Sequence, residues 1–128
     1  MKKFLLTAIV LFSVSAFSDG DHTPDFSSAT DAKVCAHIGH MTGMKTKGEA
    51  EFIVDILMPK TVSDVQVDLW MPEHSHGTSP VTVNPHKKNK FKIKKAVFTM
   101  TGKWHARISF NVDKVNQKIE IPLTITEK

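Results

Sequence analysis

Cysteine is almost absent from this chain, since Cys35 is the only one among 128 residues. A small domain held together by disulfides carries an even set of cysteines, so a disulfide framework is excluded. The lone thiol is then a metal ligand, an intermolecular partner or an inert buried side chain, and the sequence does not choose among the three. A chain of this length can bury a hydrophobic core without covalent crosslinks.

Long apolar runs are also missing beyond the first residues. The run at residues 4–12 is too short to span a bilayer. It follows Lys2 and Lys3 and precedes the small residues Val14-Ser15-Ala16, which is the order found in secretory signals, with a second cleavage option at residues 16–18. We therefore expect residues 1–16 to be a cleaved signal peptide. The mature chain would be exported to the periplasm or another extracytoplasmic space, without a transmembrane segment.

A strong excess of one charge is missing as well. The chain has 17 Lys and Arg against 13 Asp and Glu, and its net charge of +4 falls to +2 once Lys2 and Lys3 leave with the signal. The basic balance is thus partly a targeting feature and does not indicate nucleic-acid binding. Six lysines lie between residues 87 and 95. They favour a solvated strand face with a protected edge, or else a surface for an anionic membrane or an acidic partner.

Catalytic signatures are equally scarce. The chain contains neither the Gly-x-Ser-x-Gly nucleophile elbow of serine hydrolases nor a pair of carboxylates at a spacing that suggests acid–base catalysis. Glu73 beside His74 and His76 is the nearest approach to a metallohydrolase, and it is a weak one. We therefore expect a protein without enzymatic activity.

What the chain does have is alternation of apolar and polar residues, which is typical of half-buried strands. Residues 49–58 and 65–71 alternate in this way. A short strand is predicted at residues 81–83, before an Asn84-Pro85 turn. Residues 119–125 form a closing strand, which Pro122 places at a sheet edge. Residues 17–33 are polar and without periodicity, so they are predicted to be a flexible leader.

The stretch from residue 91 to 110 changes its alternation partway. Phe91 and Ile93 share one parity and Ala96 the other, which predicts a bulge or bend near Lys94-Lys95. A three-residue loop at residues 101–103 is predicted to close a hairpin that pairs position 100 with position 104. That pairing would place the following residues on one face: Phe98, Met100, Trp104, Ala106, Ile108 and Phe110.

Together these strands predict an all-β fold. About six or seven short strands separated by turn signals are typical of an antiparallel, immunoglobulin-like β-sandwich. No convincing helix and no internal repeat interrupts the pattern. The domain is expected to cover residues 34–128.

The segment from Met71 to Gly77 reads Met-Pro-Glu-His-Ser-His-Gly and follows directly on a predicted strand. In extended backbone His74 and His76 leave the same side of the chain, close enough to bind one metal ion. A thioether from Met71 or Met100 would favour copper, since Cu(I) prefers soft ligands. Further candidate ligands are His105 and His86. Alternatively, the histidines are part of a structural loop, and the methionines fill the core.

A second group of soft donors lies between Val34 and Gly48, and it consists of Cys35, His37, His40, Met41 and Met44. Thiolate, imidazole and thioether suit a soft metal, although no standard zinc spacing is present. The alternative is a glycine-rich edge segment with incidental ligands. This segment could also pack beside the histidine loop, so that both contribute to one site.

Two motifs give the chain a family resemblance. Met71-Pro72-Glu73-His74-Ser75-His76-Gly77 and, further along, Phe98-Thr99-Met100-Thr101-Gly102-Lys103-Trp104 resemble the signature of the YtkA-like family. Its members are small exported or membrane-tethered β-sandwich domains, related in outline to FixH-type accessory proteins. The resemblance covers the chain after Gly48 and implies a β-sandwich loosely linked with copper handling and oxidase assembly.

Two functions are consistent with these observations. In the first, an exported domain binds copper at the His/Met loop and passes it to an exported or membrane-bound metalloprotein. In the second, the domain binds no metal, and the loop belongs to an interaction module that docks onto an exported or membrane protein complex.

Overall fold

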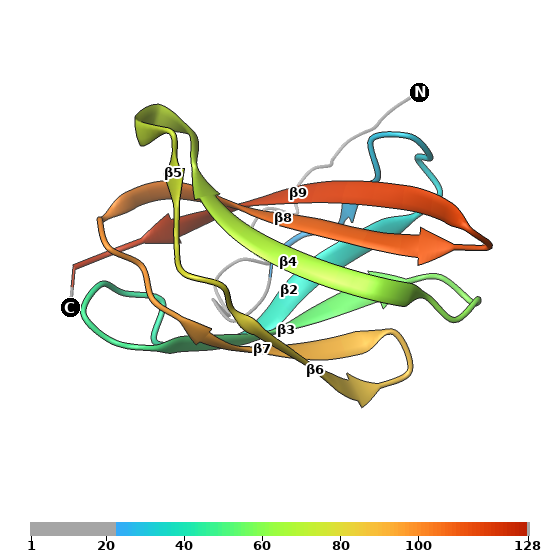
Figure 1. Ribbon diagram of the computed structural model, residues 1–128, viewed down its shortest axis with the longest axis horizontal. Coiled ribbons are helices and arrows are strands. Elements are labelled where there is room, and N and C mark those ends of the chain that lie inside the picture. The colour runs from blue at the N-terminus through green and yellow to red at the C-terminus, as the bar shows by residue number, and fades with distance from the viewer. Residues whose placement is uncertain (1–22, 128) are drawn as a thin grey trace, which may run out of the picture.

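The structure, a computed structural model, describes residues 23–127. Its strands form two antiparallel sheets that lie one above the other as a sandwich (Figure 1). One sheet has five strands in the order β1-β2-β3-β7-β6, and the other has four in the order β5-β4-β8-β9. The predicted all-β antiparallel sandwich is confirmed. The predicted signal peptide at residues 1–16 lies outside the described residues.

The five-stranded sheet consists of β1 (Phe26–Ser27), β2 (Cys35–Thr42), β3 (Ala50–Leu57), β7 (Lys90–Ala96) and β6 (Thr82–Lys87). The four-stranded sheet consists of β5 (His76–Gly77), β4 (Ser63–Met71), β8 (Gly102–Val112) and β9 (Val115–Ile125). A single 3-10 turn, η3 (Pro72–His74), connects β4 to β5.

The core lies between the two sheets and follows the alternation in the sequence. In β8 every second residue from Trp104 to Val112 is buried, and β9 repeats the pattern from Gln117 to Ile125. Phe52, Val54 and Ile56 of β3 fill the same layer from the opposite sheet. Each fully buried large apolar side chain contributes about 1.5–3 kcal/mol, so burial of these faces holds the two sheets together.

The predicted bulge is confirmed. Ala50 of β3 pairs with Ala96 of β7, but Phe52 pairs with Ile93, so β7 holds one residue more than its partner over this stretch. Lys95 takes up the extra residue with a positive φ of 61°. Phe91 and Ala96 can thereby both turn towards the core side despite their different parity. The closing strand is also confirmed at an edge, since β9 is the last strand of its sheet.

The predicted hairpin between residues 96 and 104 is wrong. Both edges of β7 are occupied, by β3 and by β6, so β8 cannot pair with it and joins β4 and β9 instead. Residues 97–101 cross from one sheet to the other at the end of the sandwich where β5 lies (Figure 1). Phe98 is buried within this crossing, whereas Met100 is 38% exposed and does not share the predicted face.

Two local predictions also need correction. Asn84 and Pro85 lie inside β6, and the chain turns at residues 88–89, where Asn89 has a positive φ of 58°. Pro85 is accommodated because β6 is an edge strand. In the predicted flexible leader, residues 23–33 are attached to the sandwich. Phe26 pairs with Ala36 of β2, and the buried Ser28 hydroxyl donates to Gln117 Oε1 at 2.6 Å.

Candidate functional site

The histidine loop is built at the end of β4. Met71 is the last residue of the strand, and Pro72 begins η3 with a ring that pre-sets the helical φ. Ser75 ends the turn in the left-handed region, at φ 51°, and its N–H donates to the Pro72 carbonyl at 3.4 Å. The chain then reverses so that His76 pairs with Met71. The loop therefore presents both histidines beside the end of the sheet.

Gly77 makes this reversal possible. A Cβ at this position would lie 2.8 Å from the Leu69 carbonyl oxygen, a distance that real Cβ atoms do not adopt. With hydrogen in its place, Gly77 pairs directly with Trp70, and the next residue, Thr78, donates its N–H to Leu69 O at 3.2 Å. The glycine thus allows β5 to approach β4 closely and keeps the histidine loop short.

His74 and His76 lie near each other on this loop. Their ring centroids are 6.0 Å apart with an angle of 41° between the planes. His74 is exposed and His76 is half-buried. A metal ion bonded at about 2.0 Å to one nitrogen of each ring holds the two centroids roughly 5–6 Å apart. The observed separation therefore allows the two rings to bind one ion.

The half-buried histidine rests on an aromatic support. His76 meets the edge of Trp104 with ring centroids 5.6 Å apart, and Trp104 in turn meets Phe98 at 5.2 Å. Trp104 is fully buried, and its indole N–H donates to the Met100 carbonyl at 3.0 Å. Because the indole is fixed by packing and by this bond, it restricts the positions that the His76 ring can take.

The two methionines differ in their surroundings. Met71 is 1% exposed and belongs to the core, and its Cε would lie 2.9 Å from a Cβ at Gly102. Met100 is partly exposed and lines a shallow depression with Thr46 and Lys47. Met71 thus pairs directly with His76 of the histidine loop, while the Met100 carbonyl accepts from the Trp104 indole that contacts His76.

The structure does not bring the other two candidate histidines to this loop. His105 lies on the outer face of β8, opposite in direction to Trp104, with its Nδ1 3.7 Å from Glu120 Oε1. His86 lies on β6 in the other sheet, where it shares a pocket with His37 and His40. The candidate metal ligands at the histidine loop are therefore Met71, His74 and His76.

The second group of soft donors is divided between the two faces of β2 and the segment after it. Cys35 is a half-buried free thiol, 3.6 Å from the Ser27 hydroxyl and from the Ala32 carbonyl. His37 lies between two carboxylates, with Nδ1 3.1 Å from Asp25 Oδ1 and Nε2 3.5 Å from Asp55 Oδ2. Met41 and Met44 pack against the core instead.

Two further features of residues 23–127 bear on the function. Within this range, His, Cys, Asp and Glu side chains nowhere gather in a group of three or more that could hold a metal ion. Over the same residues, no helix is both long and apolar enough to cross a membrane. Any metal site at the histidine loop would therefore use two imidazoles with a thioether or an outside ligand.

The fold and this loop define a small β-sandwich protein with a histidine-bearing loop at one end. The sequence model of the YtkA-like family matches residues 45–109, which are half of the chain, and the protein belongs to this family. The matched range includes both sequence motifs and runs from before β3 into β8. Comparison with curated proteins gives no match, and comparison with solved structures gives none either.

Two features of the site were not predicted from sequence. One is the support of His76 by Trp104, which depends on the crossing of residues 97–101 between the sheets. The other is the pocket that joins His37, His40 and His86 on the five-stranded sheet. His37 alternates with buried residues of β2, which indicates that it faces outward, but the strand order that brings His86 near it cannot be predicted from the sequence.

Proposed function

We propose that this protein is exported and binds a soft metal ion, copper above all, at the rim formed by His74 and His76. The observation that supports this most directly is the 6.0 Å separation of the two rings. The chain also belongs to the YtkA-like family, and its resemblance to that family implies a loose link with copper handling. The protein acts as a carrier of the ion, not as an enzyme.

The proposed ligands are the two imidazoles and, as a third donor, the thioether of Met71. Met71 of β4 pairs with His76 of β5, so its side chain lies on the same face of the sheet as the His76 imidazole. Imidazole and thioether together suit Cu(I) better than Zn²⁺, because the thioether is a soft ligand. Met100 has an exposed side chain at the same end of the sandwich and is an alternative third donor.

The exposure of the site suits delivery. His74 is exposed and His76 half-buried, so a partner can reach an ion held between them. An ion with few protein ligands is also released more readily than one enclosed by a complete set. The proposed partner is an exported or membrane-bound metalloprotein that receives the ion.

A second candidate function is a metal-free interaction module. It is favoured by the patch beside the loop, where the Arg107 guanidinium lies 4.5 Å from the centroid of the Trp70 ring. Trp70 pairs with Gly77, so this patch is continuous with the histidine loop. Trp and Arg are enriched at the energetic centres of protein interfaces.

The deciding experiment is a titration of the purified protein with Cu(I) against a competing chelator. The test variant is His74→Ala/His76→Ala, and the matched control is His86→Ala/His105→Ala, which removes two histidines elsewhere. Trp104 fluorescence in a Trp70→Phe background gives a local readout, since Trp104 contacts His76. Replacing Met71 by Leu in a further variant tests the thioether at nearly constant volume.

We expect one equivalent of Cu(I) to bind, with binding lost in the test variant and kept in the control. Binding that survives in the test variant would move the site to Cys35 and its neighbours. Absence of binding in the unmodified protein would overturn the metal proposal and leave the interaction module. Export is tested separately, by N-terminal sequencing of the protein from the extracytoplasmic fraction, where we expect a start directly after Ala16 or Ser18.

A further inference from the structure

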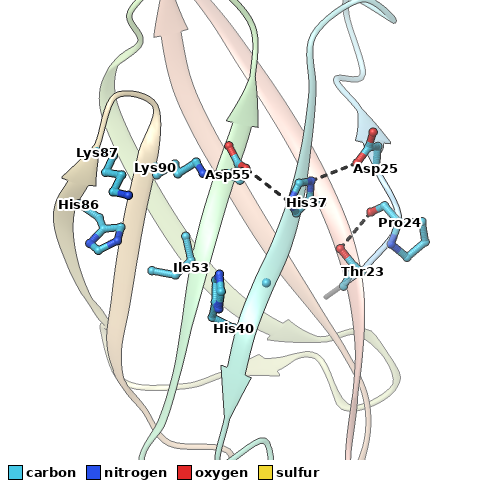
Figure 2. A pocket seen from close by; sticks show the side chains of 11 residues that line it. Thr23, Pro24, Asp25, His37, His40, Ile53, Asp55, His86, Lys87 and Lys90 are labelled. Atoms are coloured by element: carbon cyan, nitrogen blue, oxygen red, sulfur yellow. Dashed lines mark hydrogen bonds and ion pairs between the residues drawn. The ribbon is translucent and has the colours of Figure 1, made fainter. Parts of the chain in front are cut away.

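A second concave surface lies on the outer face of the five-stranded sheet. It is a pocket of about 590 Å³ to which the N-terminal segment, β2, β3, β6 and β7 contribute (Figure 2). Its titratable side chains are Asp25, His37, His40, Asp55, His86, Lys87 and Lys90. The family motifs and the proposed copper site make no use of this surface.

A row of paired residues crosses the sheet along one side of the pocket. His37 pairs with Asp55, Asp55 with Lys90, and Lys90 with Lys87. Residues opposite each other in antiparallel strands have their side chains on the same face, so the row lines the pocket. Asp55 Oδ2 lies 3.5 Å from His37 Nε2 and 3.7 Å from Lys90 Nζ, and Asp25 Oδ1 lies 3.1 Å from His37 Nδ1. Both carboxylates of the pocket are therefore already paired.

Positive charge is left over in the same row. Lys87 is exposed and forms no ion pair with any residue that the structure describes. Lys92 and Lys94 continue on the same face of β7 as Lys90, and within residues 23–127 they too lack a carboxylate partner. A concave site with unpaired ammonium groups attracts anions.

The floor of the pocket is apolar. Ile53 alternates with the core residues Phe52 and Val54, so it points away from the core, yet it is only 7% exposed. Figure 2 shows its side chain between those of His40 and His86. An aliphatic group between the two imidazoles separates them, and no metal-holding group of three such side chains occurs among the described residues. The pocket therefore suits an organic molecule better than a metal ion.

We propose that this pocket binds a small organic anion, namely a carboxylate with a short apolar body. The carboxylate pairs with the ammonium of Lys87, and the apolar body lies on Ile53. His40 and His86 flank the ligand and offer ring N–H donors to its oxygens. The assignment depends on three features that coincide here: an unpaired cation, an outward-facing buried isoleucine, and a concave shape.

The test is a titration followed by ¹H–¹⁵N NMR spectra of the purified protein, with hexanoate as the probe. Hexylammonium has the opposite charge and an apolar body one carbon longer than that of hexanoate, and inorganic phosphate is an anion without an apolar body. Lys87→Gln removes the free cation, and Ile53→Thr removes apolar contact while keeping a β-branched side chain. The matched control is Lys118→Gln, an exposed lysine of β9 in the other sheet.

We expect saturable shifts at residues 39, 53, 86 and 87 with hexanoate and none with hexylammonium. Lys87→Gln should weaken hexanoate binding about tenfold, which is the loss of one charge-assisted contact. Ile53→Thr should weaken it several-fold, and Lys118→Gln should leave it unchanged. The proposal is overturned if hexanoate gives no saturable shift, if phosphate binds equally well, or if Lys87→Gln binds hexanoate as tightly as the unmodified protein.

Discussion

The indole Nε1 of Trp104 donates a hydrogen bond to the carbonyl oxygen of Met100, 3.0 Å away. Trp104 lies in β8, whereas Met100 lies in the segment that crosses from the five-stranded sheet. The bond therefore holds the crossing segment against the four-stranded sheet. The same indole contacts Phe98 on the core side and His76 on the loop side. One buried side chain thus connects the sheet crossing, the core and the candidate metal site.

Replacing this indole tests the connection. Trp104→Phe removes the hydrogen bond and leaves a cavity, and we expect it to lower the free energy of unfolding by about 2–4 kcal/mol. Urea denaturation followed by circular dichroism measures the change. Trp70→Phe, on the outer face of the sheet, is the control and should cost about 1 kcal/mol or less. Equal losses in the two variants would contradict the role given to Trp104.

Gly102, at the start of β8, has a backbone conformation that other residues rarely adopt. Its φ is 126°, and a Cβ there would lie 2.9 Å from Met71 Cε. We expect Gly102→Ala to destabilise the protein by about 1–3 kcal/mol, because the side chain strains the backbone and displaces Met71. The midpoint of thermal unfolding measures this loss of stability. Gly48→Ala is the matched control, since nothing lies within 4 Å of a Cβ at that position, and its stability should not fall.

The buried Asn89 holds the loop after β3 in place. Its side chain accepts from the Val62 N–H at 3.0 Å and donates to the carbonyls of Met58 and Lys60 at 3.1 and 2.7 Å. Asn89→Ala loses these bonds and places alanine at positive φ, so we expect a loss of roughly 2–4 kcal/mol in urea denaturation.

A second substitution at this position separates the two contributions. Asn89→Gly also loses the bonds but relieves the positive φ of 58°, so it should be less destabilising than Asn89→Ala. If both variants are as stable as the unmodified protein, the side-chain bonds of Asn89 contribute nothing to the fold.

Gln117 of β9 attaches the segment before β2 to the sandwich. Its Oε1 accepts from the hydroxyls of Ser28 at 2.6 Å and Thr30 at 2.8 Å. We expect Gln117→Ala to speed hydrogen exchange at the amides of Ser28 and Ala29 at least tenfold, because the side-chain bonds that support their backbone bonds are gone. Exchange at the amide of Ile121 should change little. A uniform increase over the whole chain would indicate global destabilisation instead.

Much of the strand content was predictable because burial on one face imposes a period of two. The alternation at residues 49–58 and 65–71 predicted β3 and β4 nearly at their observed positions, and that at residues 119–125 predicted the later part of β9, which begins at Val115. The bulge near Lys95 was predictable for the same reason, since a change of parity requires an extra residue. The hairpin at residue 101 was not, because local turn signals do not reveal which strand edges are already occupied.

The candidate site divides in the same way. His74 and His76 do lie near each other, but the extended backbone predicted for them is wrong, because His74 ends the 3-10 turn η3 and Ser75 is left-handed. The burial of Met71 follows from its parity in β4. The prediction that His86 joins the histidine loop is wrong, because β6 belongs to the other sheet. The same strand order brings His86 beside His37 and His40, which are far from it in sequence.

The sequence by itself determined which residues of the alternating strands β3, β4 and β9 face inward and that the two histidines share one short loop, since both depend on neighbours within a few positions. Only the tertiary structure decided that β7 and β8 lie in different sheets, that Trp104 supports His76, and that three histidines share a pocket. These features depend on which strands compete successfully for each sheet edge. That competition is settled by the packing of the whole core and not by any local stretch of the chain.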